Sequence, residues 1–436
     1  MFRAVTTTVQ RTMTCRVRAL PLYTGDTPAP NANKNAKNDA KKNRNQSNRA
    51  NAGRQIRSPP LAAVLRTFLL MKIAVDVHSL GTRAAGNETY YQQLLRGLVL
   101  DPSRHDYTLF YTHAEALRAN PTDERFRWVG IPKNPLPRLC LSLPQLLRKS
   151  PPDVFHCQYI RPLGVQCKTV VTIHDLSHEH YPEMANPLET VAMRMLVRAT
   201  ARSADRILTV SEFCARDIAR TYDVPEEKVR VAYPVVAEKF QPREKNSAQE
   251  HVARTYGVAP PFLLYVGRIQ ARKNLVRLME AYARARKQGV TAKLVLVGKP
   301  DYGAEQVFAK IDELGLRESV ILPGYVKSED LPLFYNAAEA FLFPSIFEGF
   351  GLPVVESMAS GLPAITSFGS SLEEVAGDAA LLVDPAGTDA LADAIVRILS
   401  DADLRRTLAE RGLRRAAQFT VQNFAGSVLE VYRSLV

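Results

Sequence analysis

Short apolar runs alternate with helical stretches along the chain from Met71 onward. Runs such as Thr169–Ile173 are nearly continuously apolar, which is typical of parallel strands buried on both faces. Strands separated by helices indicate a parallel sheet with helices on both sides. The strands expected first are Ile73–Val77, Thr108–Tyr111, Val154–His156, Thr169–His174 and Ile207–Val210, with helices at Glu88–Leu100, Pro187–Arg202 and Glu212–Tyr222.

The expected helix Pro187–Arg202 repeats apolar residues at the spacing of one helical face. Val191, Met195, Leu196 and Ala199 occupy that face and are predicted to point into the core. Ser211 stands just before the next helix and is predicted to be its N-cap.

A second series of strands and helices begins near residue 259. Its expected strands are Phe262–Gly267, Lys293–Gly298, Val320–Leu322, Ala340–Phe343, Ala364–Thr366 and Leu381–Val383, and its helices include Leu275–Lys287, Glu305–Leu314, Val354–Ala359 and Asp389–Leu399. We therefore predict an α/β protein with two doubly wound, Rossmann-like domains, residues 71–240 and 259–418, joined by a polar linker over 241–258. Because ligands of such sheets bind beyond the carboxyl ends of the strands, the site is expected in a cleft between the domains.

The positive charge of the chain is concentrated at its start. Residues 1–70 carry 13 lysines and arginines against 2 acidic residues, whereas the other 366 residues carry 44 against 42. Residues 31–51 contain eight asparagines and no apolar residue larger than alanine, which predicts a disordered basic extension over residues 1–70. A tail that binds RNA or anionic lipid, a transit peptide, and a true start at Met71 are the alternatives. The nearly neutral body predicts no specific nucleic-acid partner.

Cysteine usage and hydropathy bear on the compartment. The five cysteines are odd in number and lack C-x-x-C spacing, which argues against a disulfide framework and for a reducing compartment, here the cytoplasm. No run of 18 uncharged apolar residues occurs, so no membrane-spanning helix is expected.

The most informative motif runs from Phe343 to Glu356. An expected strand is followed by a loop with Glu348, Gly349 and Gly351, and then by a helix whose first turn carries Pro353. Free N–H groups at such a helix start attract anions, and two carboxylates accept hydrogen bonds from sugar or ribose hydroxyls. The alternative for either glutamate alone is an ordinary helix-dipole or solvated residue.

A second cluster, Arg268 to Lys273, follows the strand that ends at Gly267. Two cations at the carboxyl end of a strand are placed to hold a diphosphate, although two surface charges would give the same pattern. The loop from Gly81 to Gly86 has P-loop spacing but lacks the required lysine, so a Walker-type NTPase is excluded.

His174 ends a strand in the expected cleft and stands beside Asp175. A histidine there can orient a hydroxyl or stabilise charge. A structural histidine, or zinc binding together with His178, are the alternatives; the order of residues is not His-Glu-x-x-His, which disfavours zinc.

Together these residues resemble a known family. The run from Glu348 to Glu356 looks like the E-x7-E motif of the retaining nucleotide-sugar glycosyltransferases of family 4, which have the GT-B fold. The resemblance extends over nearly all of residues 71–436, and includes the Gly86 loop, Thr172 to Asp175, Gly267-Arg268 with Lys273-Asn274, and Ser370 to Ala376. Ala85 to Glu88 departs from the family's Gly-x-Gly-Arg-Tyr, which bears on the acceptor.

The resemblance implies roles for single residues. Arg268 and Lys273 would hold the donor diphosphate, Glu348 the sugar hydroxyls and Glu356 the ribose hydroxyls. His174 would face the sugar and acceptor. The other donor-binding positions implied are Gly86, Tyr325, Val326, Phe350, Gly351 and Leu352. No metal or other cofactor is implied, and a C-terminal helix over residues 419–436 would cross back to the first domain.

The activity expected is retaining transfer of a hexose, mannose or glucose, from a nucleotide diphosphate sugar to a glycan or lipid-linked glycan. Another GT-B enzyme, such as a sugar-nucleotide epimerase or a phosphorylase, and a non-catalytic binding protein with a functional tail are the alternatives. Arg194, Arg198 and Arg202 form a basic stripe, and the segment Leu136–Leu147 is apolar with flanking bases. Both would suit a peripheral contact with an anionic membrane at its inner face, although an ordinary solvated surface with core contacts fits better.

Overall fold

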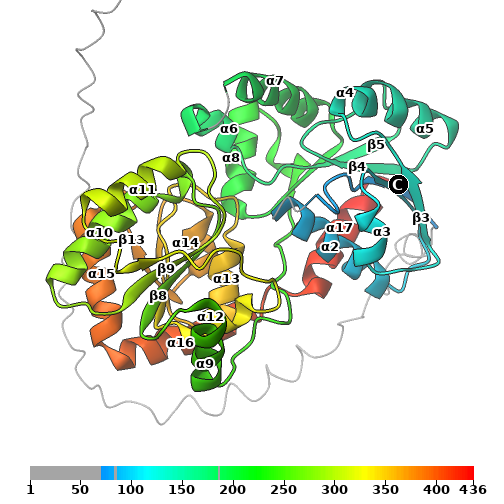
Figure 1. The fold of residues 1–436 in the computed structure, drawn as a ribbon. Coiled ribbons are helices and arrows are strands. Elements are labelled where there is room, and N and C mark those ends of the chain that lie inside the picture. Colours follow the sequence, from blue (N-terminus) through cyan, green and yellow to red (C-terminus); the bar gives the residue numbers. More distant parts are fainter. Residues whose placement is uncertain (1–69, 83–85, 185–186) are drawn as a thin grey trace, which may run out of the picture. The chain divides into compact units, whose positions relative to one another are not determined.

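The computed structural model describes residues 70–82, 86–184 and 187–436. Except for Leu70, the predicted disordered extension over residues 1–70 lies outside these ranges, as do residues 83–85 of the loop before Gly86. The described chain forms two parallel sheets (Figure 1). This confirms the α/β fold class with two doubly wound sheets.

The first lobe is built on a seven-stranded sheet in the order β3-β2-β1-β4-β5-β6-β7. Its strands are β1 (Lys72–Asp76), β2 (Asp106–Tyr111), β3 (Phe126–Gly130), β4 (Val154–Gln158), β5 (Lys168–Thr172), β6 (Arg206–Thr209) and β7 (Val229–Val231). Its helices are α2 (Gly86–Leu100), α3 (Glu115–Ala119), α4 (Pro135–Pro137), the π-helix η1 (Arg138–Ser142), α5 (Leu143–Lys149), α6 (Ser177–His180), η2 (Pro182–Met184), α7 (Pro187–Ser203), α8 (Glu212–Tyr222) and η3 (Glu226–Lys228). The edge strands β3 and β7 were not predicted.

The second lobe repeats this strand order over six strands, β10-β9-β8-β11-β12-β13. The strands are β8 (Phe262–Val266), β9 (Lys293–Val297), β10 (Val320–Ile321), β11 (Ala340–Phe343), β12 (Ala364–Ser367) and β13 (Ala380–Val383). The helices are α9 (Lys245–Tyr256), η4 (Ala271–Lys273), α10 (Leu275–Lys287), α11 (Ala304–Glu313), α12 (Leu331–Ala337), α13 (Leu352–Ala359), α14 (Ser371–Ala376), α15 (Thr388–Ser400) and α16 (Ala402–Ala416), and the chain ends with α17 (Val421–Arg433). The strand order reverses direction between β8 and β11, which is where open α/β sheets bind ligands.

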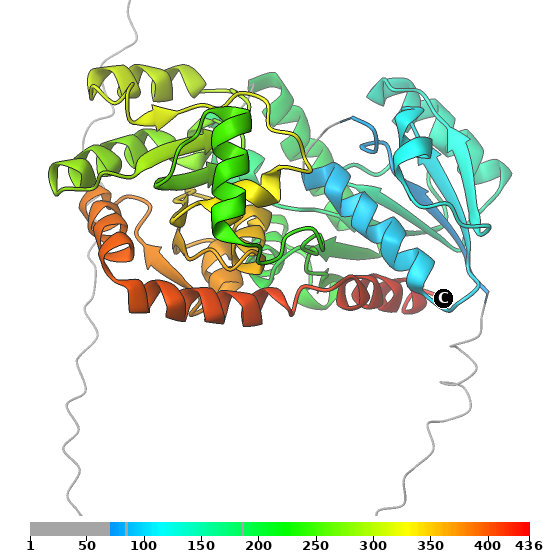
Figure 2. The ribbon, with the colours of Figure 1, turned by 60° about the horizontal axis from the view of Figure 1, so that its bottom comes forward.

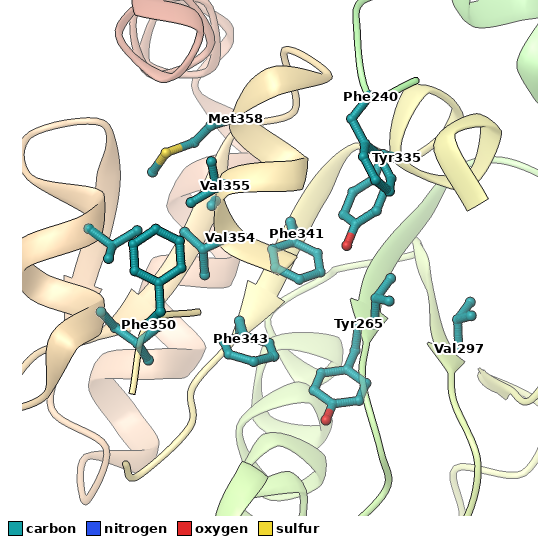
Figure 3. Close-up of a cluster of buried hydrophobic side chains, with 14 of the residues drawn as sticks. Phe240, Tyr265, Val297, Tyr335, Phe341, Phe343, Phe350, Val354, Val355 and Met358 are labelled. Carbon is teal, nitrogen blue, oxygen red and sulfur yellow. The ribbon is translucent and has the colours of Figure 1, made fainter. Parts of the chain in front are cut away.

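Aromatic side chains fill the core beneath this switch point (Figure 3). Tyr265 on β8 stacks on Phe343 at the end of β11, with ring centroids 5.9 Å apart. Val354 and Val355 of α13 are fully buried against the same core. The core therefore fixes the end of β11 and the start of α13, which the Glu348 loop connects.

Helix α17 packs against α2 of the first lobe (Figure 2). Gly97 on α2 gives the two helices room, since a Cβ there would collide with Ala425. Near the end of α17, Tyr432 forms a 2.6 Å hydrogen bond with His156 Nδ1 on β4. The C-terminal helix thus contacts the first lobe through both small and polar residues.

Two expectations differ from the structure. On α7, all four predicted core residues, Val191, Met195, Leu196 and Ala199, are exposed, and Val197 and Thr200 are buried instead. Periodicity identifies an apolar stripe but does not say which side of the helix faces the protein. Here polar contacts hold the opposite side against the lobe; for example, Arg161 N–H donates to Thr200 Oγ1 over 3.0 Å.

The segment expected as a polar linker contains helix α9. It buries only Ala248 and Val252 in its twelve residues, so its apolar pattern is weak. The helix packs against α12 of the second lobe. None of the helices in the described ranges is long and apolar enough to cross a membrane.

Candidate active site

A cavity of about 520 Å³ opens between loops of the two lobes at the switch point of the second sheet. Most of the predicted site residues line it: Gly86, His174, Arg268, Lys273, Glu348, Phe350, Gly351, Leu352 and Glu356. Tyr325 and Val326 are not among its lining residues, and Tyr325 is exposed. The structure therefore brings together nine of the eleven predicted positions around one cavity.

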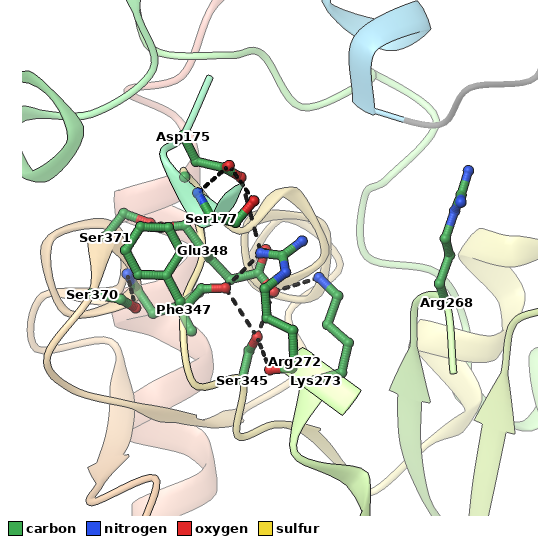
Figure 4. A network of polar contacts seen from close by, with 12 residues as sticks. Asp175, Ser177, Arg268, Arg272, Lys273, Ser345, Phe347, Glu348, Ser370 and Ser371 are labelled. Carbon is green, nitrogen blue, oxygen red and sulfur yellow. Dashed lines mark hydrogen bonds and ion pairs between the residues drawn. The ribbon is translucent and has the colours of Figure 1, made fainter. Parts of the chain in front are cut away.

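The Glu348 carboxylate is the centre of a polar network (Figure 4). Lys273 Nζ and Ser345 Oγ donate to Oε1, the latter over 2.6 Å, and Arg272 Nη1 donates to Oε2 over 3.2 Å. Burial by itself would raise the pKa of Glu348, but the charges of Arg272 and Lys273 outweigh it, so the pKa lies below its usual value. Glu348 is thus an ionised carboxylate, held in a fixed position at the cavity wall.

Arg272 is a site residue that the sequence pattern did not single out. Its Nη1 also donates to the Phe347 carbonyl over 2.6 Å and lies 4.0 Å from Asp175 Oδ2 in the first lobe. Burial opposes its charge, yet the carboxylates of Glu348 and Asp175 raise its pKa. Arg272 therefore links the Glu348 loop to the loop that follows β5.

The two predicted cations do not meet in this structure. Lys273 is nearly buried and contacts Glu348, whereas the Arg268 side chain is 53% exposed and pairs with Asp301 over 2.9 Å. Figure 4 shows Arg268 standing apart from the network, at the rim of the cavity. The sequence could have pointed to Arg272 only through its position next to Lys273. Both residues lie in the short turn η4, which directs their side chains to Glu348.

The start of α13 forms another wall of the cavity. Gly351 precedes the helix with φ of +98°, a left-handed conformation that favours glycine, and a Cβ there would also collide with Leu372. No side chain caps this helix start, and Pro353 occupies its first turn. The positive end of the helix dipole, beside Gly351 and Leu352, is therefore open to an anion in the cavity.

Glu356 lies one turn into the same helix and also lines the cavity. Its Oε2 accepts a 2.8 Å hydrogen bond from Tyr335 Oη. Burial raises the pKa of Glu356 to about 7, against the lowering effects of Tyr335 and Lys239. Its carboxyl group is therefore close to half-ionised at neutral pH.

His174 approaches from the first lobe. Its Nε2 lies 2.9 Å from Gln158 Nε2, and its ring packs edge-on to Tyr90 with centroids 4.9 Å apart. Burial lowers the pKa of His174 to about 4, so the imidazole is neutral. His178 instead contacts Tyr222 Oη over 2.9 Å, and within the described residues no group of three or more His, Cys, Asp or Glu side chains is placed to hold a metal ion.

The two lobes touch directly beside the Glu348 loop. Ser211, the predicted N-cap of α8, accepts from Cys214 N–H and also donates to the Gly349 carbonyl over 2.8 Å. A Cβ on Gly349 would collide with the His174 carbonyl. Glu374 of α14 accepts hydrogen bonds from the Glu212 and Phe213 N–H groups at the start of α8, over 2.9 and 2.8 Å. These contacts, which no motif in the sequence predicts, join the lobes around the site.

Comparisons with known proteins identify the family of this chain. A family model described as glycosyl transferases group 1 matches residues 249–415, and one described as Glycosyltransferase Family 4 matches residues 84–239. The chain is 34% identical over 272 residues to O-antigen chain mannosyltransferase B of Escherichia coli, covering 62% of this chain and 71% of that protein. It is 33% identical over 245 residues to an MMP alpha-(1->4)-mannosyltransferase of Mycolicibacterium hassiacum, covering 55% of this chain and 56% of the relative.

Solved structures share the fold. Sucrose-phosphate synthase from Thermosynechococcus elongatus superimposes with a TM-score of 0.69 at 24% identity, covering 84% of this chain and 99% of that one. The fold and the site define a two-lobed GT-B protein. The chain belongs to glycosyltransferase family 4, a retaining family of hexosyltransferases, which confirms the family predicted from the motifs.

Proposed function

We propose that this enzyme transfers a hexose, mannose in the first instance, from a nucleotide diphosphate sugar to a hydroxyl of a glycan or lipid-linked glycan. One observation carries the proposal: a buried, ionised Glu348 sits between two cations and an open helix start, inside a cavity between the lobes. Two relatives named as mannosyltransferases support mannose as the first sugar to test. The four cysteines among the described residues are free, in line with work in the cytoplasm.

The donor diphosphate would lie between Lys273 and the start of α13. The ammonium group and the helix dipole both favour negative charge there. Arg268, at the rim, would exchange Asp301 for a phosphate oxygen. The same groups would stabilise the charge that grows on the leaving phosphate, which is usually the largest electrostatic contribution to such a reaction.

The sugar would be held by the Glu348 carboxylate, which accepts hydrogen bonds from its hydroxyls. Glu356, in its ionised form, would accept from the ribose hydroxyls. His174 is neutral and would hydrogen-bond the sugar or the acceptor. In the transfer step the anomeric C–O bond to phosphate breaks and a C–O bond to the acceptor forms on the same face. The acceptor proton passes to the leaving phosphate oxygen.

The activity is tested by incubating the full chain with GDP-mannose or UDP-glucose, with and without an acceptor glycan, and following the anomeric configuration by NMR. We expect acceptor-dependent release of nucleotide diphosphate and an α-linked product from an α-linked donor. Donor turnover that needs no acceptor would favour an epimerase, and no turnover with any donor would favour a binding protein. The donor base is found by comparing thermal stabilisation by GDP and UDP.

A further inference from the structure

Helix α7 presents apolar side chains to solvent. Leu188 is 84% and Met195 69% exposed, and Val191 and Leu196 are also exposed at the spacing of one helical face. The residues that hold the helix to the lobe are on the other side and include Val197 and Ala201. The stripe that the sequence placed in the core is therefore an outward-facing surface.

Neighbouring segments also expose apolar side chains. Leu136, in α4, is 72% exposed, and Leu141 and Leu163 are exposed as well. The segments adjoin, because Leu163 N–H donates to the Leu139 carbonyl over 3.1 Å and Arg161 N–H donates to Thr200 of α7. Figure 1 shows α7, α4 and α5 along one edge of the first lobe. We call this the apolar surface; its residues are Leu136, Leu141, Leu163, Leu188, Val191, Met195 and Leu196.

The concentration of these side chains is unusual for the molecule. Among the described residues, sixteen large hydrophobic side chains are exposed, and seven of them belong to the apolar surface. Single exposed apolar residues need no explanation, but a gathered group marks an interaction site or a membrane contact. The apolar surface is therefore a candidate interaction site.

The charges around the apolar surface indicate which partner. Its exposed neighbours on the same segments include five cations, Lys133, Arg148, Lys149, Arg198 and Arg202. The basic stripe predicted on α7 is only partly available, because the guanidinium of Arg194 donates to the His178 and Glu179 carbonyls. The Glu179 carboxylate is largely buried and forms ion pairs with Arg194 and Arg198, over 3.4 and 3.8 Å. The rim is thus positive, although Glu183 is also exposed.

We propose that the apolar surface docks on an anionic lipid bilayer, with its leucines and methionine in the interface and its cations at the headgroups. A second copy of the chain is a poorer partner, because a symmetric contact would place these cations against their own copies. The surface also lies near the cavity: α6, which precedes α7, contacts the Glu348 loop through His180 and Phe347, with ring centroids 5.6 Å apart. If the acceptor is lipid-linked, a point that rests on the proposed function, docking brings it to the cavity mouth.

Vesicle co-sedimentation of the full chain tests the docking without relying on catalysis. We compare the wild type with Leu136→Gln/Met195→Gln, and with the matched control Leu322→Gln/Leu413→Gln, whose residues are exposed in the second lobe. On vesicles of phosphatidylglycerol and phosphatidylcholine, the surface variant should lose affinity by roughly tenfold or more, since each apolar side chain leaves the interface. The control should bind like the wild type, and the basic residues 1–70 are common to all three proteins.

A second variant tests the charges. Lys133→Gln/Lys149→Gln should weaken binding by roughly thirtyfold at low salt and much less at high salt, because each of the two cations contributes about 1 kcal/mol near an anionic surface. Unchanged thermal unfolding verifies that each variant folds. The proposal is overturned if the surface variant binds vesicles as tightly as the wild type. It is also overturned if the substitutions abolish a dimer in solution and leave vesicle binding unchanged.

Discussion

Replacing Glu356 by glutamine should remove a pH-dependent loss of stability. Burial raises the pKa of Glu356 from 4.5 to about 7 in the folded protein. The folded state therefore binds this proton more tightly than the unfolded chain does. The stabilising contribution is fully present below about pH 4.5 and is lost as the pH rises through about 7.

The size of the effect follows from the shift. With pKa values of 4.5 unfolded and about 7 folded, the free energy of unfolding falls by about 2 kcal/mol between about pH 5.5 and about pH 8 through this group alone. Glu356 lines the cavity and is partly accessible, so solvent makes this an upper value. A glutamine keeps an oxygen that can accept from Tyr335 Oη but has no charge to desolvate.

The assay is urea unfolding of the wild type and Glu356→Gln at both pH values, compared at equal ionic strength. Other titrating groups act in both proteins, so the difference between them isolates Glu356. Relative to the wild type, the free energy of unfolding of the variant should rise by about 1–2 kcal/mol on going from about pH 5.5 to about pH 8. Tyr335→Phe removes a hydrogen bond to the Glu356 carboxylate. It should therefore raise the pKa of Glu356 and move the pH-dependent loss of stability to higher pH. An equal pH dependence in wild type and glutamine variant would refute the reasoning.

Outcomes are also expected for four further variants. Lys273→Ala should lower kcat by roughly 10²–10³-fold, measured in steady-state transfer, because one of the charges facing the leaving phosphate is lost. Arg272→Met should lower both transfer and stability, by about 3 kcal/mol in urea unfolding, since it leaves Glu348 and Asp175 short of a buried partner. Arg268→Met, whose side chain is exposed, should lower transfer alone; equal stability losses in both arginine variants would contradict the assigned burial. Glu374→Gln should speed hydrogen exchange of the first amides of α8, and unchanged exchange would show that this contact does not hold the lobes.

Much of the fold follows from the apolar pattern. A buried parallel strand such as β8 is a continuous apolar run, so it is easily recognised. The partly exposed edge strand β3 and the helix α9, with two buried residues, give a weak signal and were missed. For α7 the periodicity was recognised, but its orientation depends on polar contacts that no periodicity encodes.

The site was only partly predictable for a similar reason. The Glu348 loop is recognisable in the sequence from its glycines, its proline and the helix that follows. Which cation reaches Glu348 depends on the backbone, because Asn274 adopts a left-handed conformation with φ of 60° directly after η4. That turn directs Arg272 and Lys273 inward and leaves Arg268 at the rim, an outcome that spacing alone does not give.

The central claim, that the Glu348 carboxylate holds the donor sugar between the lobes, is tested most directly by comparing donor binding and transfer in Glu348→Gln. The matched control is Glu410→Gln, an exposed glutamate of α16. We expect the control to match the wild type, whereas Glu348→Gln still binds the bare nucleotide diphosphate but transfers hexose at least roughly 10²-fold more slowly. Transfer by Glu348→Gln at the wild-type rate would contradict the account.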